Sequence, residues 1–251
     1  MKNRNTQKIY FYILNKNVAD KTAFFENAKS EYNERSADLL SSLNGYVAAS
    51  GKSNKDERML TAALLLKSLG HLASEENITL PDALKKDELD KPYFPTALKK
   101  DECGKPYFDG SDLKLSISHN EDFVAIAYAK GADIGIDIEG EIPAEKAEKL
   151  SKRFPAIATL ISEKSDEATE GDTKICLFEM LEGGRFEPLS LIPTDDSFTA
   201  KWTAAEALMK CDGRGFSALG EIENLRKNMQ VFGFYLPSEN KRIYISLAAK
   251  E

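Results

Sequence analysis

The sequence predicts an α+β fold made of two similar α/β halves, residues 1–113 and 114–251, that pack together in one chain as a pseudo-dimer. Each half combines short strand-like runs with one long helix-like segment. Near residue 113 the sequence changes from charged, loop-rich segments to three closely spaced β-type runs. A chain of 251 residues can bury a sizeable core, either as one large domain or as two small ones.

The first half begins with a predicted strand and continues with helices. The run KIYFYIL at 8–14 is apolar, and no small-residue cleavage site follows it, so it indicates a buried strand rather than a signal peptide. Residues 20–43 are polar with loose helical periodicity, and the glycines within 45–54 predict a break. Residues 55–70 have one apolar face and predict an amphipathic helix that stops at Gly70.

The second half predicts strands, two helices and a closing pair of antiparallel strands. The helix at 195–210 has Ser197 or Asp196 as its N-cap and ends at the glycines of CDGRG. Residues 163–184 are acidic and poorly patterned, so we expect an irregular insertion there. The remaining elements are strands at 113–118, 123–129 and 133–139, a helix at 143–154, and strands at 229–236 and 241–249.

Composition and charge argue against several classes of protein. The net charge is −7, whereas a nucleic-acid partner needs clustered Lys and Arg. No run of about 18 apolar residues is present, so we expect no membrane span. The 3 cysteines form no CxxC motif, and the sequence has only 2 histidines, which argues against a zinc site. Reduced thiols in a cytoplasmic protein are the expected state.

One phrase occurs twice between residues 83 and 110. The first copy reads ALKKDELDKPYFPT (83–96) and the second reads ALKKDECGKPYFDG (97–110). Two copies are too few to build the continuous core of a repeat protein. They indicate instead a local duplication in a surface loop, which a fold tolerates at little cost.

Two carboxylates stand on one predicted strand in the segment IGIDIE. Side chains alternate along a strand, so Asp137 and Glu139 share one face, while the isoleucines at 134, 136 and 138 point into a core. Carboxylate oxygens suit a hard cation such as Mg²⁺. The alternative is a polar strand face in water.

Two further clusters carry candidate chemistry. Trp202, Glu206 and Lys210 follow one another at helical spacing, which places Glu206 at the border of the apolar stripe. An ordinary Glu–Lys pair on a helix surface is the alternative. Ser118 and His119 begin a turn after a strand, where they could donate to a phosphate, although a lone histidine is more often structural.

Taken in order, these clusters resemble the motifs of the 4′-phosphopantetheinyl transferase family, in particular its surfactin-synthetase-type (Sfp-like) branch. Arg58 matches an arginine on the family's N-terminal helix. The sequence departs from the family pattern at Ser116, usually Asn, and at Ala205, usually Lys. The matching motifs are Gly104-Lys105-Pro106, Ser118-His119, the segment Ile134 to Glu139, Trp202/Glu206/Lys210, and Gly213-Arg214-Gly215.

The resemblance implies an enzyme that moves the 4′-phosphopantetheine arm of coenzyme A onto a serine of an apo acyl or peptidyl carrier protein. Adenosine 3′,5′-bisphosphate is the other product. Mg²⁺ would be held by Asp137, Glu139 and Glu206, with Glu206 also the candidate base and Lys210 on the diphosphate. Coenzyme A would be contacted by Arg58, Gly104, Lys105, Pro106, Ser118, His119, Asp137 and Lys210.

The resemblance also distinguishes the two copies of the duplicated phrase. Only the second contains the family's Gly-Lys-Pro, so Lys105 is the expected ligand contact and Lys91 a spare. One chain is expected to build the whole cleft as a monomer. The alternatives are a non-catalytic relative that binds coenzyme A or a carrier protein, and a plain α+β interaction module whose Asp137 and Glu139 are solvated.

Overall fold

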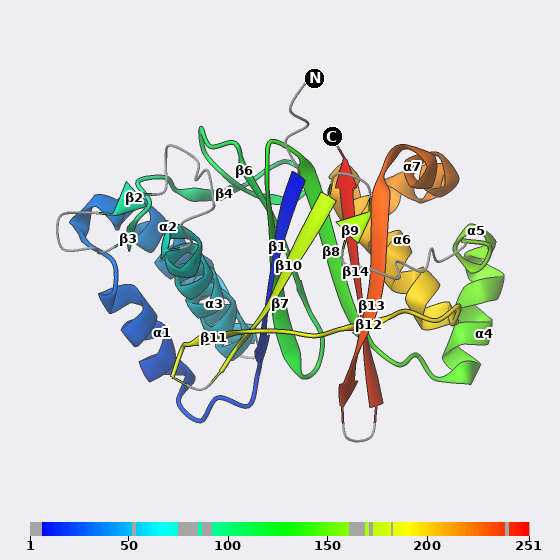
Figure 1. Ribbon diagram of the computed structural model, residues 1–251, viewed down its shortest axis with the longest axis horizontal. Coiled ribbons are helices and arrows are strands. Elements are labelled where there is room, and N and C mark those ends of the chain that lie inside the picture. Colours follow the sequence, from blue (N-terminus) through cyan, green and yellow to red (C-terminus); the bar gives the residue numbers. More distant parts are fainter. Residues whose placement is uncertain are drawn as a thin grey trace.

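The computed structural model of this chain describes residues 7–51, 54–74, 85–86, 92–160, 169–170, 173–181, 183–238 and 241–250. Two β-sheets face each other, and helices cover the outer face of each sheet (Figure 1). The arrangement is therefore a four-layered α/β/β/α sandwich, which confirms the predicted α+β class. In the described part of the chain, no helix is both long enough and apolar enough to cross a bilayer.

The first sheet has the order β11-β10-β1-β7-β6, with β9 beside β10, and helices α1 to α3 cover it. Its middle strand β1 is buried on both faces, which explains its nearly continuous apolar run. The members are β1 (Gln7–Asn15), α1 (Lys21–Ser30), η1 (Glu34–Ser36), α2 (Ala37–Ala48), α3 (Lys55–Ser74), β6 (Leu113–His119), β7 (Phe123–Lys130), β9 (Thr169–Glu170), β10 (Thr173–Met180) and β11 (Phe186–Pro188).

The second sheet has the order β12-β13-β14-β8, and α6 packs on its outer face. Strands β13 and β14 pair antiparallel, as the sequence predicts. The members are β8 (Asp133–Gly140), α4 (Ala144–Arg153), α5 (Pro155–Ala158), β12 (Ile192–Pro193), α6 (Phe198–Asp212), η3 (Gly215–Glu221), α7 (Ile222–Asn228), β13 (Gln230–Ser238) and β14 (Lys241–Lys250).

Three local expectations were wrong. Helix α3 continues through Gly70 to Ser74, and α2 runs through Gly45 to Ala48. In each case a buried apolar face stabilises the helix by more than the glycine costs, about 1 kcal/mol. The expected irregular insertion at 163–184 contains β10, which pairs parallel with β1 in the first sheet. Residues 163–168, 171–172 and 182 of that segment lie outside the described residues.

The two sheets meet where the edge strand β6 lies beside the edge strand β8. Hydroxyl groups join these strands: Ser116 Oγ accepts from Ile136 N at 3.1 Å, and Ser118 Oγ accepts from Ile138 N at 3.2 Å. The division expected at residue 113 coincides with the start of β6, and the first sheet takes strands from both sides of it. The seam between β6 and β8 is therefore one place where hydrogen bonds connect the two sheets.

The duplicated phrase folds as two hairpins with equivalent register. In the first, β2 (Lys85–Lys86) pairs with β3 (Pro92–Tyr93); in the second, β4 (Leu98–Lys100) pairs with β5 (Pro106–Phe108). The phenylalanine of each KPYF is buried, and the rings of Phe94 and Phe108 meet edge to face with centroids 4.5 Å apart. Both copies therefore contribute to the core.

Candidate functional site

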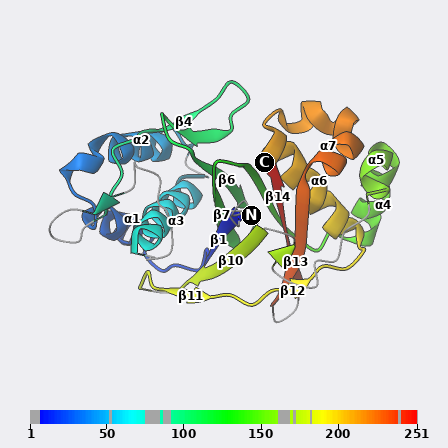
Figure 2. The same cartoon turned by 45° about the horizontal axis from the view of Figure 1, so that its top comes forward.

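A pocket of about 410 Å³ opens at the seam between β6 and β8. Figure 2 shows the β4 hairpin between α2 on one side and α6 on the other, so several separate segments contribute to the pocket. Most of the residues predicted for the site line it. They are Gly104, Pro106, Ser118, His119, Asp137, Glu139, Glu206 and Lys210.

Helix α6 can reach β8 because Gly135 has no side chain. A Cβ at this position would lie 2.0 Å from Ala207 O and 2.4 Å from Cys211 N, both backbone atoms of α6. Gly135 and Asp137 lie on the same face of β8, and Glu206 and Lys210 extend from the facing helix. The glycine therefore sets the distance at which these side chains meet.

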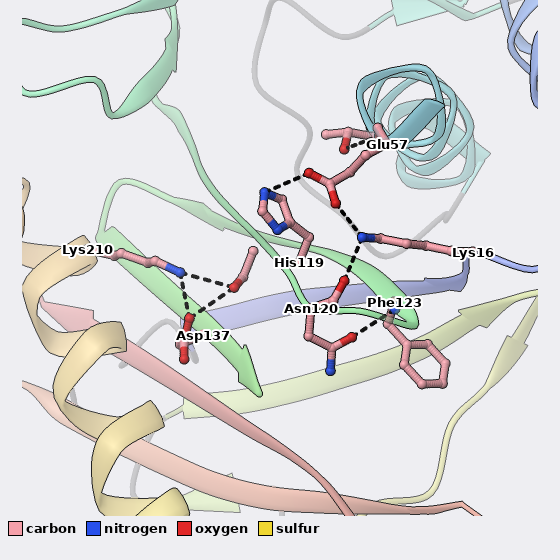
Figure 3. Close-up of polar contacts among 9 residues, drawn as sticks. Lys16, Glu57, His119, Asn120, Phe123, Asp137 and Lys210 are labelled. Atoms are coloured by element: carbon pink, nitrogen blue, oxygen red, sulfur yellow. Dashed lines mark hydrogen bonds and ion pairs between the residues drawn. The ribbon is translucent and has the colours of Figure 1, made fainter. Parts of the chain in front are cut away.

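Asp137 is the buried centre of the polar cluster. Its side chain is 5% exposed, and Lys210 Nζ donates to its Oδ1 at 2.7 Å (Figure 3). Ser118 Oγ donates to the same oxygen at 3.0 Å. A solvated strand face, one of the alternatives from the sequence, does not describe Asp137.

Ser118 and Lys210 do not form a nucleophile and its base. Lys210 Nζ donates to Ser118 Oγ at 3.0 Å, and the serine proton points to Asp137. A base would have to accept that proton, whereas this lysine is the cation of an ion pair with Asp137. Ser118 is also buried, so its hydroxyl positions Lys210 and Asp137 rather than attacking a substrate.

Negative charge accumulates in the pocket. Burial, together with the negative charges of Asp137 and Glu139, raises the pKa of Glu206 from its ordinary value of 4.5 to about 7, against the opposing effect of Lys210. Burial, and then the charge of Asp137, also raises the pKa of Glu139. Neighbouring carboxyl groups raise one another's pKa, and such groups are common in cation sites and in sites of acid–base catalysis.

The donor set fits a divalent cation. Asp137 Oδ2 is buried and has no hydrogen-bond partner in the described protein, so one ligand oxygen is available. Glu139 and Glu206 line the same pocket, and oxygen ligands suit Mg²⁺. Among the described residues, however, no three His, Cys, Asp or Glu side chains already surround one point. The position beside Asp137 Oδ1 is taken by Lys210, and the carboxylates would have to turn to share an ion.

Lys105 lies between the pocket residues Gly104 and Pro106 in the sequence, but it is not among the residues that line this pocket. Its ammonium donates to Cys211 O at 2.8 Å, at the C-terminal end of α6. A lysine is favourable there because the last carbonyls of a helix carry partial negative charge. Lys105 thus joins the second hairpin to α6 and lines a neighbouring pocket of about 390 Å³. Its expected contact with a nucleotide stays a prediction, and Lys91 lies outside the described residues.

The side chain of His119 contacts Glu57 on helix α3, which covers the first sheet. Its Nε2 lies 3.0 Å from Glu57 Oε1 on α3, and the other oxygen of Glu57 pairs with Lys16 (Figure 3). Lys16 Nζ also donates to Asn120 O in the turn that follows β6. This network fixes the β6–β7 turn against α3, so His119 borders the pocket in a defined position.

Arg58 does not line the pocket itself but contacts Tyr46, which does. Its guanidinium lies 4.9 Å from the centroid of the Tyr46 ring, and Lys100 lies 5.6 Å from the same ring. The sequence analysis missed Tyr46 and Lys100. Strand alternation in the second hairpin could have found Lys100, whereas no local pattern singles out Tyr46.

Comparison of the chain with models of known protein families gives no match, and a search of curated proteins finds none either.

Proposed function

We propose that this protein transfers the 4′-phosphopantetheine arm of coenzyme A to a serine of an apo carrier protein and releases adenosine 3′,5′-bisphosphate. The observation that carries the proposal is the meeting of β8 and α6, which brings Asp137, Glu139, Glu206 and Lys210 to one pocket. These are the residues on which the resemblance to 4′-phosphopantetheinyl transferases rests.

The proposed reaction is a phosphoryl transfer. The serine oxygen of the carrier protein attacks the phosphorus that bears the pantetheine, the bond from this phosphorus to the oxygen of the nucleotide breaks, and the serine proton leaves to a base. Glu206 is the proposed base, because its pKa of about 7 in the metal-free protein is suited to accepting a proton near neutrality. Lys210 stabilises the negative charge that develops on the leaving nucleotide.

Asp137, Glu139 and Glu206 would hold Mg²⁺. When bound, the ion neutralises charge on the diphosphate and on the carboxylates themselves. Two observations support this assignment: Asp137 Oδ2 is buried without a hydrogen-bond partner among the described residues, and the pKa of both glutamates is raised. Ser118 acts through Lys210 and Asp137 by keeping both in place.

The same proposal extends to the whole chain. The two predicted halves, residues 1–113 and 114–251, would pack as a pseudo-dimer within one monomer, with the pocket where the two sheets adjoin. The protein would act in the cytoplasm, where coenzyme A and carrier proteins meet. Coenzyme A would enter along the Gly104–Pro106 turn and His119.

Incubation with coenzyme A, Mg²⁺ and an apo carrier protein tests the proposal. Mass spectrometry should show the carrier gain one phosphopantetheine group, and Glu206→Gln should abolish the gain. Binding of coenzyme A without any gain would favour the non-catalytic relative. Neither binding nor transfer, with several carrier proteins, would favour the interaction module and contradict the proposal.

A further inference from the structure

Two buried hydroxyl groups join helix α6 to strand β14 beside the candidate site. Thr203 Oγ1 lies 2.9 Å from Ser246 Oγ. Thr203 is 0% exposed and Ser246 is 2% exposed, so water does not replace either partner. A buried hydroxyl is costly unless it is hydrogen-bonded, whereas valine or alanine would pack at such positions without that requirement. Apolar packing alone therefore does not explain the pair.

The hydrogen bonds of the pair have a defined direction. Thr203 Oγ1 donates its one proton to Ala200 O, in the preceding turn of α6, at 3.0 Å. Ser246 is consequently the donor in the bond between the two hydroxyls, and Thr203 Oγ1 is the acceptor. The bond to Ala200 O also fixes the rotamer of the β-branched threonine. Ser246 on the sheet is thus bonded to one fixed atom of the helix.

The hydroxyl pair lies next to the candidate metal ligands. Ser246 is directly opposite Asp137 in the antiparallel pairing of β14 with β8, so both side chains point to the face that α6 covers. On the helix, Thr203 precedes Glu206 by three residues and Lys210 by seven, which places all three on one side of α6. A shift of Thr203 along the sheet would therefore move Glu206 and Lys210 as well.

Other contacts of α6 are farther from Glu206 or less directional. Thr199 Oγ1 accepts from Ile142 N at 3.0 Å in the first turn, and Cys211 Sγ donates to Asp133 O at 3.3 Å in the last. Between these ends, the helix contacts β8 through a flexible lysine and a close approach at a glycine. The hydroxyl pair joins two short side chains one turn from Glu206, and hydrogen bonds weaken steeply away from their preferred angle.

We propose that Thr203 and Ser246 are positioning residues for the candidate site. Their hydrogen bond holds α6 at one place along β14 and so keeps Glu206 at its place beside the carboxylates of β8. Neither hydroxyl lines the pocket, so both act through Glu206. A catalytic group displaced by about 1 Å can lose about a hundredfold in rate. The effect on rate rests on the proposed function, whereas the placement of the helix is measurable without it.

A pair of substitutions separates positioning from stability. Thr203→Val keeps the shape of the side chain but leaves Ser246 without an acceptor, so we expect Tm to fall by about 2–4 °C or more. In the double variant Thr203→Val/Ser246→Ala no partner of this bond is left unpaired, and Tm should return to within about 1 °C of the unmodified protein.

Transfer kinetics at saturating Mg²⁺ should not follow Tm. We expect kcat to fall about tenfold in Thr203→Val and to stay about tenfold low in the double variant, because the directional bond is absent from both. The KM for coenzyme A should change less than about twofold, since other elements carry the opposite wall of the pocket. Thr203→Ser, which retains the hydroxyl, should restore kcat.

Thr199→Val is the matched control. It removes another buried hydroxyl from the same helix, one bonded to Ile142 N beyond the end of β8. We expect a similar fall in Tm and a change in kcat of less than about twofold. Crystal structures of the unmodified protein and the double variant, superposed on β8 and β14, should show the Cα of Glu206 displaced by about 0.5 Å or more.

The results also separate this inference from the proposed function. A double variant with the kcat of the unmodified protein, or with Glu206 in its original place, overturns the inference and leaves the transferase. An equal loss of kcat in Thr199→Val also overturns it, because any lost hydroxyl on α6 would then suffice. If the unmodified protein transfers nothing, the proposed function fails, and the crystal structures alone decide the positioning role.

Discussion

The ammonium of Lys210 lies 2.7 Å from Oδ1 of Asp137, joining helix α6 to strand β8 across 73 residues of sequence. The lysine occupies one side of the carboxylate, and the other oxygen has no partner in the described protein. A buried carboxylate with one paired and one free oxygen is costly to leave incomplete. The free oxygen of Asp137 is therefore available to a further hydrogen-bond donor or to a cation.

Asp137→Asn should abolish transfer. The substitution keeps the shape of the side chain but removes the charge that pairs with Lys210 and that would help to hold Mg²⁺, so we expect a loss of at least about a thousandfold in kcat/KM. Asp133→Asn, at an exposed position on the same strand, is the matched control and should retain activity. Circular dichroism establishes that both variants fold, and an active Asp137→Asn would remove Asp137 from the site.

Gly135→Ala should separate α6 from β8. The added Cβ would approach Ala207 O and Cys211 N, which are backbone atoms that cannot turn away. We expect the free energy of unfolding to fall by about 3 kcal/mol or more, measured by urea denaturation, with loss of transfer. Gly140→Ala on the same strand meets nothing within 4 Å and should cost little by comparison. Equal stability of the two variants would contradict the close approach of the helix.

The metal-free protein should lose stability as the pH rises from about 4.5 to about 7. The folded pKa of Glu206 is raised to about 7 from an ordinary 4.5, so its contribution is complete below pH 4.5 and is lost as the pH rises through 7. Glu206→Gln removes this loss. Because the side chain is half-buried and keeps part of its hydration, we expect a gain of about 1–2 kcal/mol at pH 8 and almost none at pH 4.5.

Thermal unfolding at both pH values, in a chelator, measures the effect of Glu206→Gln. The gain should appear as an increase of a few degrees in Tm at pH 8, on the scale of about 2–4 °C per kcal/mol. Glu223→Gln, on the exposed face of α7, serves as the control and should shift Tm equally at both pH values. A Glu206→Gln protein with the same shift at pH 4.5 and pH 8 would show that Glu206 does not carry the raised pKa.

Lys105→Met should weaken both the hairpin and coenzyme A binding. The lost hydrogen bond to Cys211 O releases the second hairpin from α6, at a cost of about 1 kcal/mol in the free energy of unfolding. Lys91→Met should have a smaller effect on coenzyme A affinity in calorimetry, because the second copy supplies the pocket residues Gly104 and Pro106 and contains the Gly-Lys-Pro motif. Similar effects of the two substitutions would remove the distinction between the copies.

Phe94→Ala should destabilise the protein about as much as Phe108→Ala. The two rings are buried against one another, so each truncation leaves a cavity, at a cost of about 3–5 kcal/mol in chemical denaturation. Only Phe108 lies on the hairpin that borders the candidate site. A neutral Phe94→Ala would mean that the first copy is dispensable for folding, as expected of a spare surface loop.

Local patterns in the sequence were sufficient for several elements of the fold. The alternation in IGIDIE placed Asp137 opposite Ile136 and Ile138, and Ser197 caps α6 by accepting from Ala200 N at 3.3 Å, as predicted. Helix α6 also ends before Gly213, which has a φ of 90°. These features depend on neighbours within a few residues, so the order of residue types is enough to define them.

The sequence alone determined the face on which Asp137 and Glu139 lie, the spacing of Glu206 and Lys210, and the duplication of the hairpin. Only the tertiary structure decided that α6 contacts β8 at Gly135, that Lys210 pairs with Asp137, and that Tyr46 and Lys100 border the same pocket. It also decided that α2 and α3 continue through glycines and that β10 joins β1. The reason is physical: side-chain periodicity is set by local backbone geometry, whereas contacts between distant segments are selected by the burial of apolar surface across the whole chain.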